Sequence, residues 1–421
     1  MRISFGLPLL FVLASFSLRA QEWTRFRGPN GTGLSDAESI PATWTQSDVN
    51  WRVPLPGEGH SQPVIWGDRL FVTAAADEGR KRFVVALRCA DGTTAWTTVY
   101  DSKTFKKHVR SSYASATPAV DEKRLYAVFS TPDSYALRAL DHDGKELWFR
   151  DLGAFKSQHG DGASPIVHGE LVVLANEQDG ESFVVALDRS TGDVKWKSPR
   201  KSEEVAYATP SVLRAADGRE SLVFSSHAHG ISAVDPKTGA LEWESPLFDK
   251  RTVSSPVIAG DVIVGTCGSG GGGNFLIAVR PGGKGDVSKS HLAYKLTAKI
   301  PYVPTSVYKD GLLFLWGDLG VVTCVEAPTG KTVWEKRVGG NYSGSPICVG
   351  DRLYALSEEG EAVVIAASRE YALLGKTPLG EGSRSVPAVA RGRLYLRTYS
   401  HLISVGGNKP PSASGRNQTG G

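Results

Sequence analysis

The sequence lacks most of the motifs that mark catalytic and metal-binding proteins. Its four cysteines form neither a Cys-x-x-Cys pair nor an adjacent pair, so we expect structural thiols and no metal site. We find no Gly-x-Ser-x-Gly, no His-Glu-x-x-His and no dinucleotide-binding fingerprint, and we therefore predict no catalytic residue. His227 and His229 could share one strand face, but no third ligand lies nearby in the sequence. The glycine-rich residues 268–273 lack the Lys-Ser/Thr of a phosphate-binding loop.

Charge and hydropathy exclude two further classes of protein. The formal charge of +4 falls to +2 when Arg2 and Arg19 are removed with a leader, and we expect no nucleic-acid partner. Residues 1–20 combine Arg2 with an apolar stretch at 5–16 that is too short to span a bilayer, which predicts a signal peptide. The protein is therefore expected to be exported, either periplasmic or extracellular, without a membrane-spanning segment. The first cysteine is Cys89, so a bacterial lipid anchor is not expected.

The dominant feature of the sequence is an eleven-residue frame that ends in tryptophan. In residues 186–196, Asp188 starts a turn and Gly192 supplies the positive φ that a short hairpin loop needs. The tryptophans of the repeated frame are Trp96, Trp148, Trp196, Trp243 and Trp334. Tyr294 and Leu374 stand at the same position in two degenerate copies. A repeat of this kind predicts an architecture of stacked or radial units.

Eight prolines mark a second period, at intervals of 41 to 55 residues, and each precedes an apolar strand. They are Pro63, Pro118, Pro165, Pro210, Pro256, Pro304, Pro346 and Pro387. Four strands in each unit of this length are the signature of a β-propeller. Trp51 precedes the first unit, whereas the last unit lacks a Trp strand. We therefore predict an all-β, eight-bladed β-propeller of four-stranded antiparallel blades, closed by the N-terminal strand around Trp51, which removes an exposed sheet edge.

The same signals divide the chain into four parts. The predicted parts are a signal peptide (1–20), an N-terminal arm (21–49), the propeller (50–405) and a disordered tail (406–421). In the arm, Arg25 and Arg27 either pack on one face of the disc or contact a partner, and we favour packing.

The segments that enter the eight proline strands should converge at one mouth of the central channel. Every segment offers an aromatic, His or Arg side chain just before its proline. These are His60, Arg110, Tyr113, His159, Tyr207, Arg251, Tyr302, Tyr342 and Arg384. They could form a ring of binding residues, or they could pack the loops, and both interpretations stay open. Asp161 is the only acid of these segments that we expect near the mouth.

The Ala-x-Asp-x-x-Thr-Gly-x-x-x-Trp frame resembles the tryptophan-docking motif of pyrroloquinoline-quinone (PQQ) repeat propellers, over about residues 50–405. The resemblance implies that each tryptophan wedges between neighbouring blades. The matching positions are Trp51, Trp96, Trp148, Trp196, Trp243 and Trp334. Within this superfamily, quinoprotein dehydrogenases are longer and use PQQ with calcium, an adjacent cysteine pair and carboxylates around the metal. This chain has no adjacent cysteines and is more similar to the short, cofactor-free BamB-like propellers.

We therefore expect an exported, non-catalytic propeller that acts as a binding or scaffold module through its channel mouth and face loops. The partner is an unknown protein or small-molecule ligand, no cofactor is expected, and the protein is expected to be a monomer. The alternative is a PQQ-dependent dehydrogenase-like enzyme with calcium, in which the Arg and His residues of the mouth hold the carboxylates of the quinone.

Overall fold

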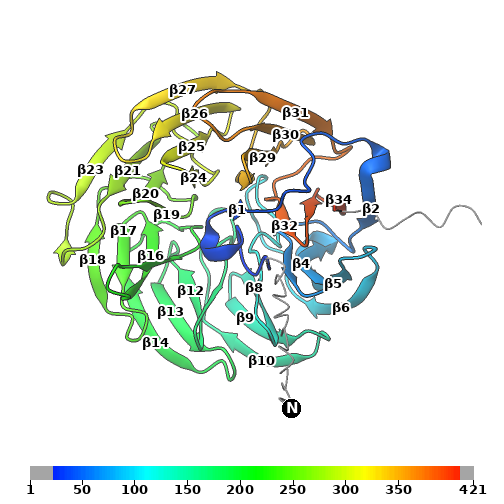
Figure 1. The fold of residues 1–421 in the computed structure, drawn as a ribbon. Helices are drawn as coiled ribbons and strands as arrows, with labels where there is room; N and C mark the ends of the chain where they lie inside the picture. Colours follow the sequence, from blue (N-terminus) through cyan, green and yellow to red (C-terminus); the bar gives the residue numbers. More distant parts are fainter. Residues whose placement is uncertain (1–21, 408–421) are drawn as a thin grey trace, which may run out of the picture.

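Residues 22–407 of the computed structural model form eight β-sheets around a central axis (Figure 1). Six sheets have four strands and two have five, which confirms the predicted eight-bladed, all-β propeller. Helix in these residues is limited to three 3₁₀ turns, η1 (Pro29–Gly31), η2 (Gln46–Asp48) and η3 (Asp77–Gly79). Across the described part of the chain, none of the helical turns could cross a membrane. The predicted signal peptide, 1–20, and most of the predicted tail lie outside the described residues.

The first four blades follow the chain in order, with the first strand of each blade innermost. Blade one contains β3 (Val64–Trp66), β4 (Arg69–Ala76), β5 (Lys81–Arg88) and β6 (Thr94–Asp101). Blade two contains β7 (Ala119–Val120), β8 (Arg124–Thr131), β9 (Ser134–Asp141) and β10 (Glu146–Asp151). Blade three contains β11 (Ile166–His168), β12 (Leu171–Asn176), β13 (Ser182–Asp188) and β14 (Val194–Arg200). Blade four contains β15 (Ser211–Arg214), β16 (Glu220–Ser226), β17 (Gly230–Val234) and β18 (Leu241–Ser245).

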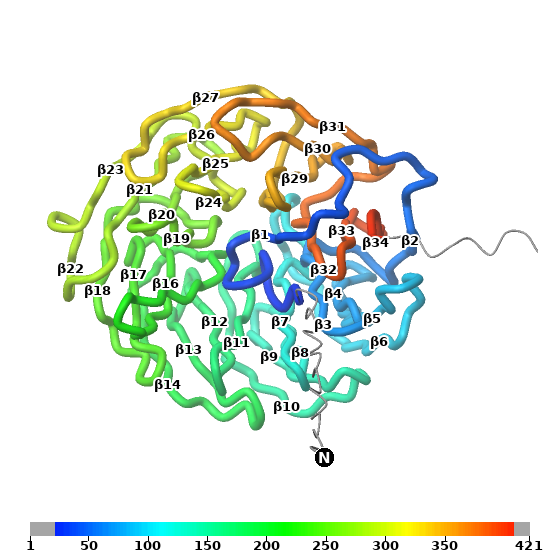
Figure 2. The backbone as a smooth tube through the Cα atoms, in the orientation of Figure 1, coloured from blue at the N-terminus to red at the C-terminus, as the bar shows by residue number. Residues whose placement is uncertain are grey.

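The other four blades complete the ring, as the tube in Figure 2 shows. Blade five contains β19 (Val257–Ala259), β20 (Val262–Cys267), β21 (Phe275–Val279) and β23 (Leu292–Leu296). Blade six contains β24 (Val307–Lys309), β25 (Leu312–Trp316), β26 (Val321–Glu326) and β27 (Thr332–Arg337). Blade seven contains β28 (Ile347–Val349), β29 (Arg352–Leu356), β30 (Glu361–Ala366) and β31 (Leu373–Pro378). Blade eight contains β32 (Ala388–Ala390), β33 (Arg393–Arg397), β34 (His401–Gly406) and β2 (Val49–Pro54).

The closure of the ring agrees with the prediction. Strand β2 pairs antiparallel with β34, and Trp51 lies opposite Ser404 in the register. The N-terminal strand therefore covers the outer edge of the last blade, which would otherwise offer unpaired backbone groups to another chain.

The core lies between the faces of adjacent blades. The middle strands are buried on both faces, as in β13, whereas the outer strand β14 alternates between buried and exposed residues. One apolar cluster joins blade two to blade three and includes Tyr126, Leu174 and Val185. Because each blade shares its core with its neighbours, no blade buries its apolar faces alone.

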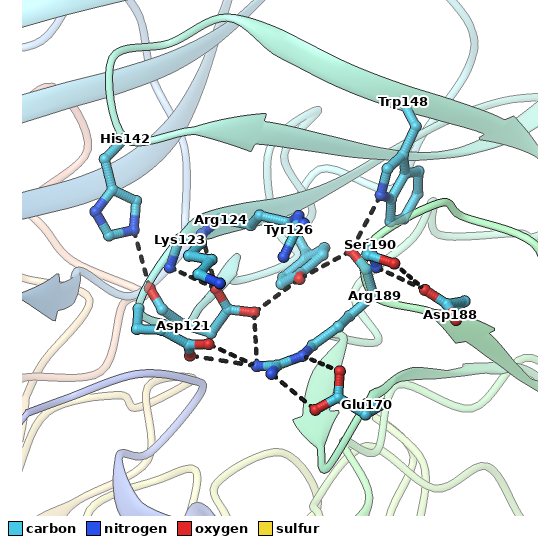
Figure 3. A network of polar contacts seen from close by, with 11 residues as sticks. Asp121, Lys123, Arg124, Tyr126, His142, Trp148, Glu170, Asp188, Arg189 and Ser190 are labelled. Atoms are coloured by element: carbon cyan, nitrogen blue, oxygen red, sulfur yellow. Dashed lines mark hydrogen bonds and ion pairs between the residues drawn. The ribbon is translucent and has the colours of Figure 1, made fainter.

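Five of the six docking tryptophans reach across to the turn of the next blade, whereas Trp243 lies opposite Gly285 of β22. The indole Nε1 of Trp51, Trp96, Trp148, Trp196 and Trp334 donates a hydrogen bond to the backbone carbonyl of Cys89, His142, Arg189, Pro236 and Ser368, respectively. Tyr294 keeps this contact with its hydroxyl, which donates to the Ala327 carbonyl. In Figure 3, Arg189 also connects blade three to blade two, because its guanidinium contacts Glu170 and Asp121.

Two short strands were not predicted, and they reinforce the ring where the frame is altered. β22 (Gly285–Asp286), in the insertion of blade five, pairs parallel with β18 and places Gly285 opposite Trp243. β1 (Leu34–Ser35) pairs parallel with the inner strand β28 of blade seven. Blade seven carries Leu374 where most blades have Trp, and the arm packs beside it, with Trp44 buried in the cluster shared by blades seven, eight and one.

The arm occupies the end of the channel opposite the proline-entry segments. Its Glu22 accepts the Gly67 N–H at the β3–β4 turn, and Asn30 bonds the backbone of Val212. Arg27 is fully buried and donates to the carbonyls of Ser306 and Pro346, 2.9 and 3.4 Å away. Burial lowers the pKa of both Arg25 and Arg27 to about 9. The arm arginines are therefore internal, which leaves the other end of the channel as the accessible mouth.

Candidate functional site at the channel mouth

A loop between blades one and two crosses the accessible mouth. This mouth loop, residues 102–113, joins β6 to the segment before β7. Its His108 ring lies 4.5 Å from the His159 ring, centroid to centroid, and the carbonyl of Val109 accepts a hydrogen bond from Arg384 at 3.3 Å. The loop thus contacts segments that belong to blade three and blade eight.

A pocket of about 650 Å³ lies beside the mouth loop. Three of the predicted binding residues, His60, Tyr113 and Arg384, line it together with Lys107 and Tyr399. Blade one contributes the acidic residues of the lining, which are Glu58, Asp77 and Glu78. The pocket is therefore polarised, with carboxylates from blade one and cations from the mouth loop and blade eight.

Burial and the surrounding positive charges keep the His60 ring neutral. Burial, together with the positive charges of Arg384, Arg397 and Lys107, lowers the pKa of His60 to about 3. Arg384 pairs with Glu358 at 3.0 Å, whereas the buried Arg397 contacts only hydroxyl and carbonyl oxygens of Ser61 and Thr73. A neutral imidazole can donate or accept a hydrogen bond from a ligand without changing the net charge of the pocket.

A second group of predicted residues meets next to the first. Arg251 donates to His159 Nε2 at 2.9 Å and hydrogen-bonds Tyr302, while the Tyr207 hydroxyl lies 3.3 Å from Ser157 Oγ. Burial lowers the pKa of His159 to about 4, and the Arg251 charge contributes to this shift. The segments before blades three, four, five and six thus converge in a single cluster, which borders the mouth loop through His108.

The remaining two predicted residues lie in different surroundings. Arg110 is exposed near the tip of the mouth loop and within electrostatic reach of Asp318. Tyr342 is only 1% exposed and packs edge-on against Trp316, with ring centroids 5.3 Å apart. Because its ring is enclosed in the core of blades six and seven, Tyr342 packs the loops and is not exposed at the mouth.

Asp161 is buried beneath the mouth. Burial raises its pKa to about 6, against the opposing effects of a Ser130 hydrogen bond and the Arg82 charge. Arg82 is itself buried and stacks against the Tyr113 ring, 4.7 Å from its centroid. Asp161 is thus partnered by protein groups and is not an accessible carboxylate.

The residues present do not fit a calcium-bound quinone. Calcium requires several oxygen ligands, usually with carboxylates among them. Residues 22–407 contain no group of three or more His, Cys, Asp or Glu side chains that could hold a metal ion. The four cysteines are free, buried and distant in sequence, and burial raises the pKa of Cys89 to about 11 and that of Cys324 to about 12.

Several mouth residues were missed by the sequence analysis. Lys107, Tyr399 and Glu58 line the pocket, yet none of them stands directly before a proline strand. The sequence did contain a signal for Lys107, which is a basic stretch without acids. No acidic residue occurs between Asp101 and Asp121, and the mouth loop carries Lys103, Lys106, Lys107 and Arg110. Tyr399 lies in the β33–β34 turn and becomes a mouth residue only through the closure of the ring.

The fold and the cross-blade Trp contacts define a PQQ-repeat-like β-propeller. A family model described as "Outer membrane protein assembly factor BamB" matches residues 43–148, 83–289 and 272–405, and the chain belongs to this family. BamB of Yersinia pestis is 21% identical over 296 residues, which cover 66% of this chain and 72% of that protein. A polyvinylalcohol dehydrogenase of Pseudomonas sp. is 28% identical over 196 residues, or 42% of this chain. That match spans only 29% of the enzyme, so the chain covers less than a third of its length.

Solved structures of a BamB protein and of a quinohemoprotein alcohol dehydrogenase share the fold. BamB from Moraxella catarrhalis aligns with a TM-score of 0.57 at 15% identity, over 85% of this chain and 96% of that one. Quinohemoprotein alcohol dehydrogenase from Comamonas testosteroni aligns with a TM-score of 0.62 at 14% identity, over 92% and 80% of the two chains. At these sequence identities the similarity shows the fold alone. This fold occurs both in scaffolds and in enzymes.

Proposed function

We propose that this protein is an exported, non-catalytic propeller that binds a partner through its channel mouth and the loops around it. The observation that carries the proposal is the convergence of His60, Tyr113 and Arg384 on one pocket of about 650 Å³. Arginine and tyrosine are residue types that dominate binding hot spots, and a propeller mouth is a concave site built from loops on a rigid scaffold. We keep the expectation of a monomer that is periplasmic or extracellular.

The test is the capture of a partner by the protein in its native compartment. The double variant Arg251→Ala plus Arg384→Ala removes two mouth cations, whereas Arg214→Ala plus Arg219→Ala removes two exposed arginines from the β15–β16 hairpin, away from the mouth. After chemical crosslinking, we expect the first variant to lose the partner that the wild type and the second variant retain. Equal capture by both variants, with unchanged melting temperatures, would refute binding through the mouth.

The alternative function is a PQQ-dependent dehydrogenase. Its support comes from the names of two relatives, the polyvinylalcohol dehydrogenase and the quinohemoprotein alcohol dehydrogenase. Cations such as Lys107 and Arg384 could contact the carboxylates of a quinone. Asp161, the acid that we expected near the mouth, is buried next to Arg82 and is not accessible as a calcium ligand.

A further inference from the structure

A second pocket, of about 460 Å³, lies on the face of the disc that carries the arm. It forms where blade eight meets blade one, and none of the predicted binding residues of the mouth lines it. Its lining includes Ser39 of the arm, Asp68 and Cys89 of blade one, and Arg391, Arg393 and Tyr395 of blade eight. Sites for small-molecule ligands span about 300–1,000 Å³, so this arm-face pocket has the size of a ligand site.

The turn that blade eight contributes to the pocket has the opposite charge to its counterparts. In most other blades, the turn between the first two strands carries an acid. These acids are Asp68, Glu122, Glu170, Asp261, Asp310 and Asp351. Blade eight carries Arg391 and Gly392 instead, with φ values of 55° and 71°, and Arg393 follows them. The repeated fold does not require arginine at this turn, so its presence needs a local explanation.

Both arginines are anchored against blade one through one nitrogen each. Arg391 Nη1 donates to the Gly67 carbonyl at 2.8 Å. Arg393 Nη1 donates to the carbonyls of Cys89 and Ala90, at 2.9 and 3.0 Å. Within residues 22–407, the other N–H groups of these two guanidiniums have no partner, and neither arginine forms an ion pair. Guanidinium N–H groups that remain free in a fixed position suit the oxygens of an anion.

The acids near the pocket are already engaged. Asp68, the carboxylate of the lining, pairs with Arg69 at 3.6 Å. Glu22 lies outside the lining and accepts the Gly67 N–H. Burial raises the pKa of Glu22, against the opposing effects of the Gly67 hydrogen bond and the Arg391 charge. The lining thus holds two arginines without a carboxylate partner against one carboxylate that has a cation partner, and its net charge is positive.

The pocket also contains a buried hydroxyl without a good acceptor. Tyr395 is fully buried, and no oxygen or nitrogen atom of residues 22–407 accepts a hydrogen bond from its hydroxyl. The polar group beside it is the Cys89 thiol, whose sulfur is a weak acceptor. A buried hydroxyl that lacks a partner is unfavourable. An anionic oxygen in the pocket would supply the missing acceptor.

We propose that the arm-face pocket is a second binding site, which takes a small molecule that carries a phosphate monoester group. A phosphate monoester presents three strong acceptor oxygens, which suit the two guanidiniums and the Tyr395 hydroxyl together. A carboxylate has only two oxygens for the same donors. The rest of the volume accommodates the organic part of the ligand. This inference is independent of the proposed function at the mouth.

The test compares phosphate monoesters with their dephosphorylated counterparts in a thermal-shift assay on the protein that lacks residues 1–20. The pairs are glucose 6-phosphate and glucose, glycerol 3-phosphate and glycerol, and AMP and adenosine. We expect at least one ester, and not its counterpart, to raise the melting temperature in a saturable way. In calorimetric titration, its Kd should rise about tenfold or more in Arg391→Gln plus Arg393→Gln. The control, Arg214→Gln plus Arg219→Gln at exposed arginines of blade four, should change the Kd less than about twofold.

Tyr395→Phe separates binding from folding. Because the hydroxyl has no oxygen or nitrogen partner, its removal should not lower the melting temperature of the free protein. The affinity for the ester should nevertheless fall severalfold. Vesicles that contain phosphatidic acid carry the same monoester group, and binding to them that depends on Arg391 and Arg393, with no soluble ester bound, would identify a lipid head group as its source.

Other outcomes contradict the proposal. Failure of every ester and of the vesicles to bind, or a Kd that ignores the loss of Arg391 and Arg393, would overturn it. The mouth variant, Arg251→Ala plus Arg384→Ala, should bind the ester with the affinity of the wild type. Loss of ester binding in that variant alone would place the ligand at the mouth and also refute the arm-face site. Partner capture tests the proposed function separately, so either can fail without the other.

Discussion

Trp196 of blade three lies directly against Gly239 in the turn of blade four. A Cβ atom at Gly239 would fall 2.5 Å from the Trp196 ring, and the residue also has a φ of 71°. The same closeness links Trp51 to Gly92 and Trp148 to Gly192. Two features of the repeated frame therefore favour glycine at this position. The backbone has a positive φ, and the ring that covers the residue leaves no room for a Cβ atom.

Replacement of the docking indole should destabilise the ring. Trp196 is only 8% exposed and bonds the Pro236 carbonyl, so Trp196→Ala leaves a cavity and an unpaired acceptor. We expect a loss of roughly 3–5 kcal/mol in the free energy of unfolding, measured by urea denaturation. Val194→Ala, an exposed position on the same strand, serves as the control. An unchanged midpoint for Trp196→Ala would mean that the indole contributes nothing to blade docking.

The two demands on the turn glycine can be separated. Gly218 also has a positive φ, 84°, but a Cβ there would meet no atom within 4 Å. Gly218→Ala should therefore cost only the backbone term, about 1–2 kcal/mol, whereas Gly239→Ala adds the collision with Trp196. We expect a clearly lower melting temperature for Gly239→Ala than for Gly218→Ala. Equal losses would show that the indole moves aside without cost.

The buried arm arginine should stabilise the propeller. Arg27→Ala removes the donors to Ser306 and Pro346, and each buried carbonyl left unsatisfied costs about 1–3 kcal/mol. Arg214→Ala, at an exposed arginine, is the control. Thermal unfolding should shift clearly for Arg27→Ala and little for the control. The opposite order would place the arm outside the cooperative unit.

Asp161 should make stability depend on pH in a defined window. Its pKa rises from 3.8 to about 6 on folding, so the native state holds a proton that the unfolded chain has already lost. The free energy of unfolding should therefore decrease as the pH rises from about 4 to 6, by on the order of 2–3 kcal/mol. Asp161→Asn should remove this decrease, and Asp143→Asn, at an exposed turn, should keep it. Parallel pH profiles for all three proteins would exclude Asp161 as the cause.

The repeated frame was sufficient to predict the blades and their closure, because the Trp, Gly and Pro positions carry local requirements that recur in each unit. Trp51 was assigned to the last blade because it had no frame of its own, and β2 does pair with β34. The strands β1 and β22 could not be predicted, since two residues carry no periodicity and pair through the ring itself.

The mouth was predicted less well because its residues come from different turns. Position before a proline strand selected His60, Tyr113 and Arg384, which line one pocket in the structure. The same rule also selected Tyr342, which is buried because Trp316 packs against it from the neighbouring strand β25. Tyr399 could be found only once blade eight had closed against blade one, whereas Lys107 lies in a basic stretch without acids that the sequence already shows.

The central claim, a binding mouth without a quinone, is tested most directly by incubating the protein that lacks residues 1–20 with PQQ and calcium. After gel filtration, the absorbance spectrum and the native mass report whether the quinone remains bound. We predict the mass of the protein alone, no quinone absorbance and no dye-linked oxidation of ethanol or polyvinyl alcohol. Calcium-dependent, stoichiometric uptake of PQQ together with such oxidation would contradict the account and establish the enzyme.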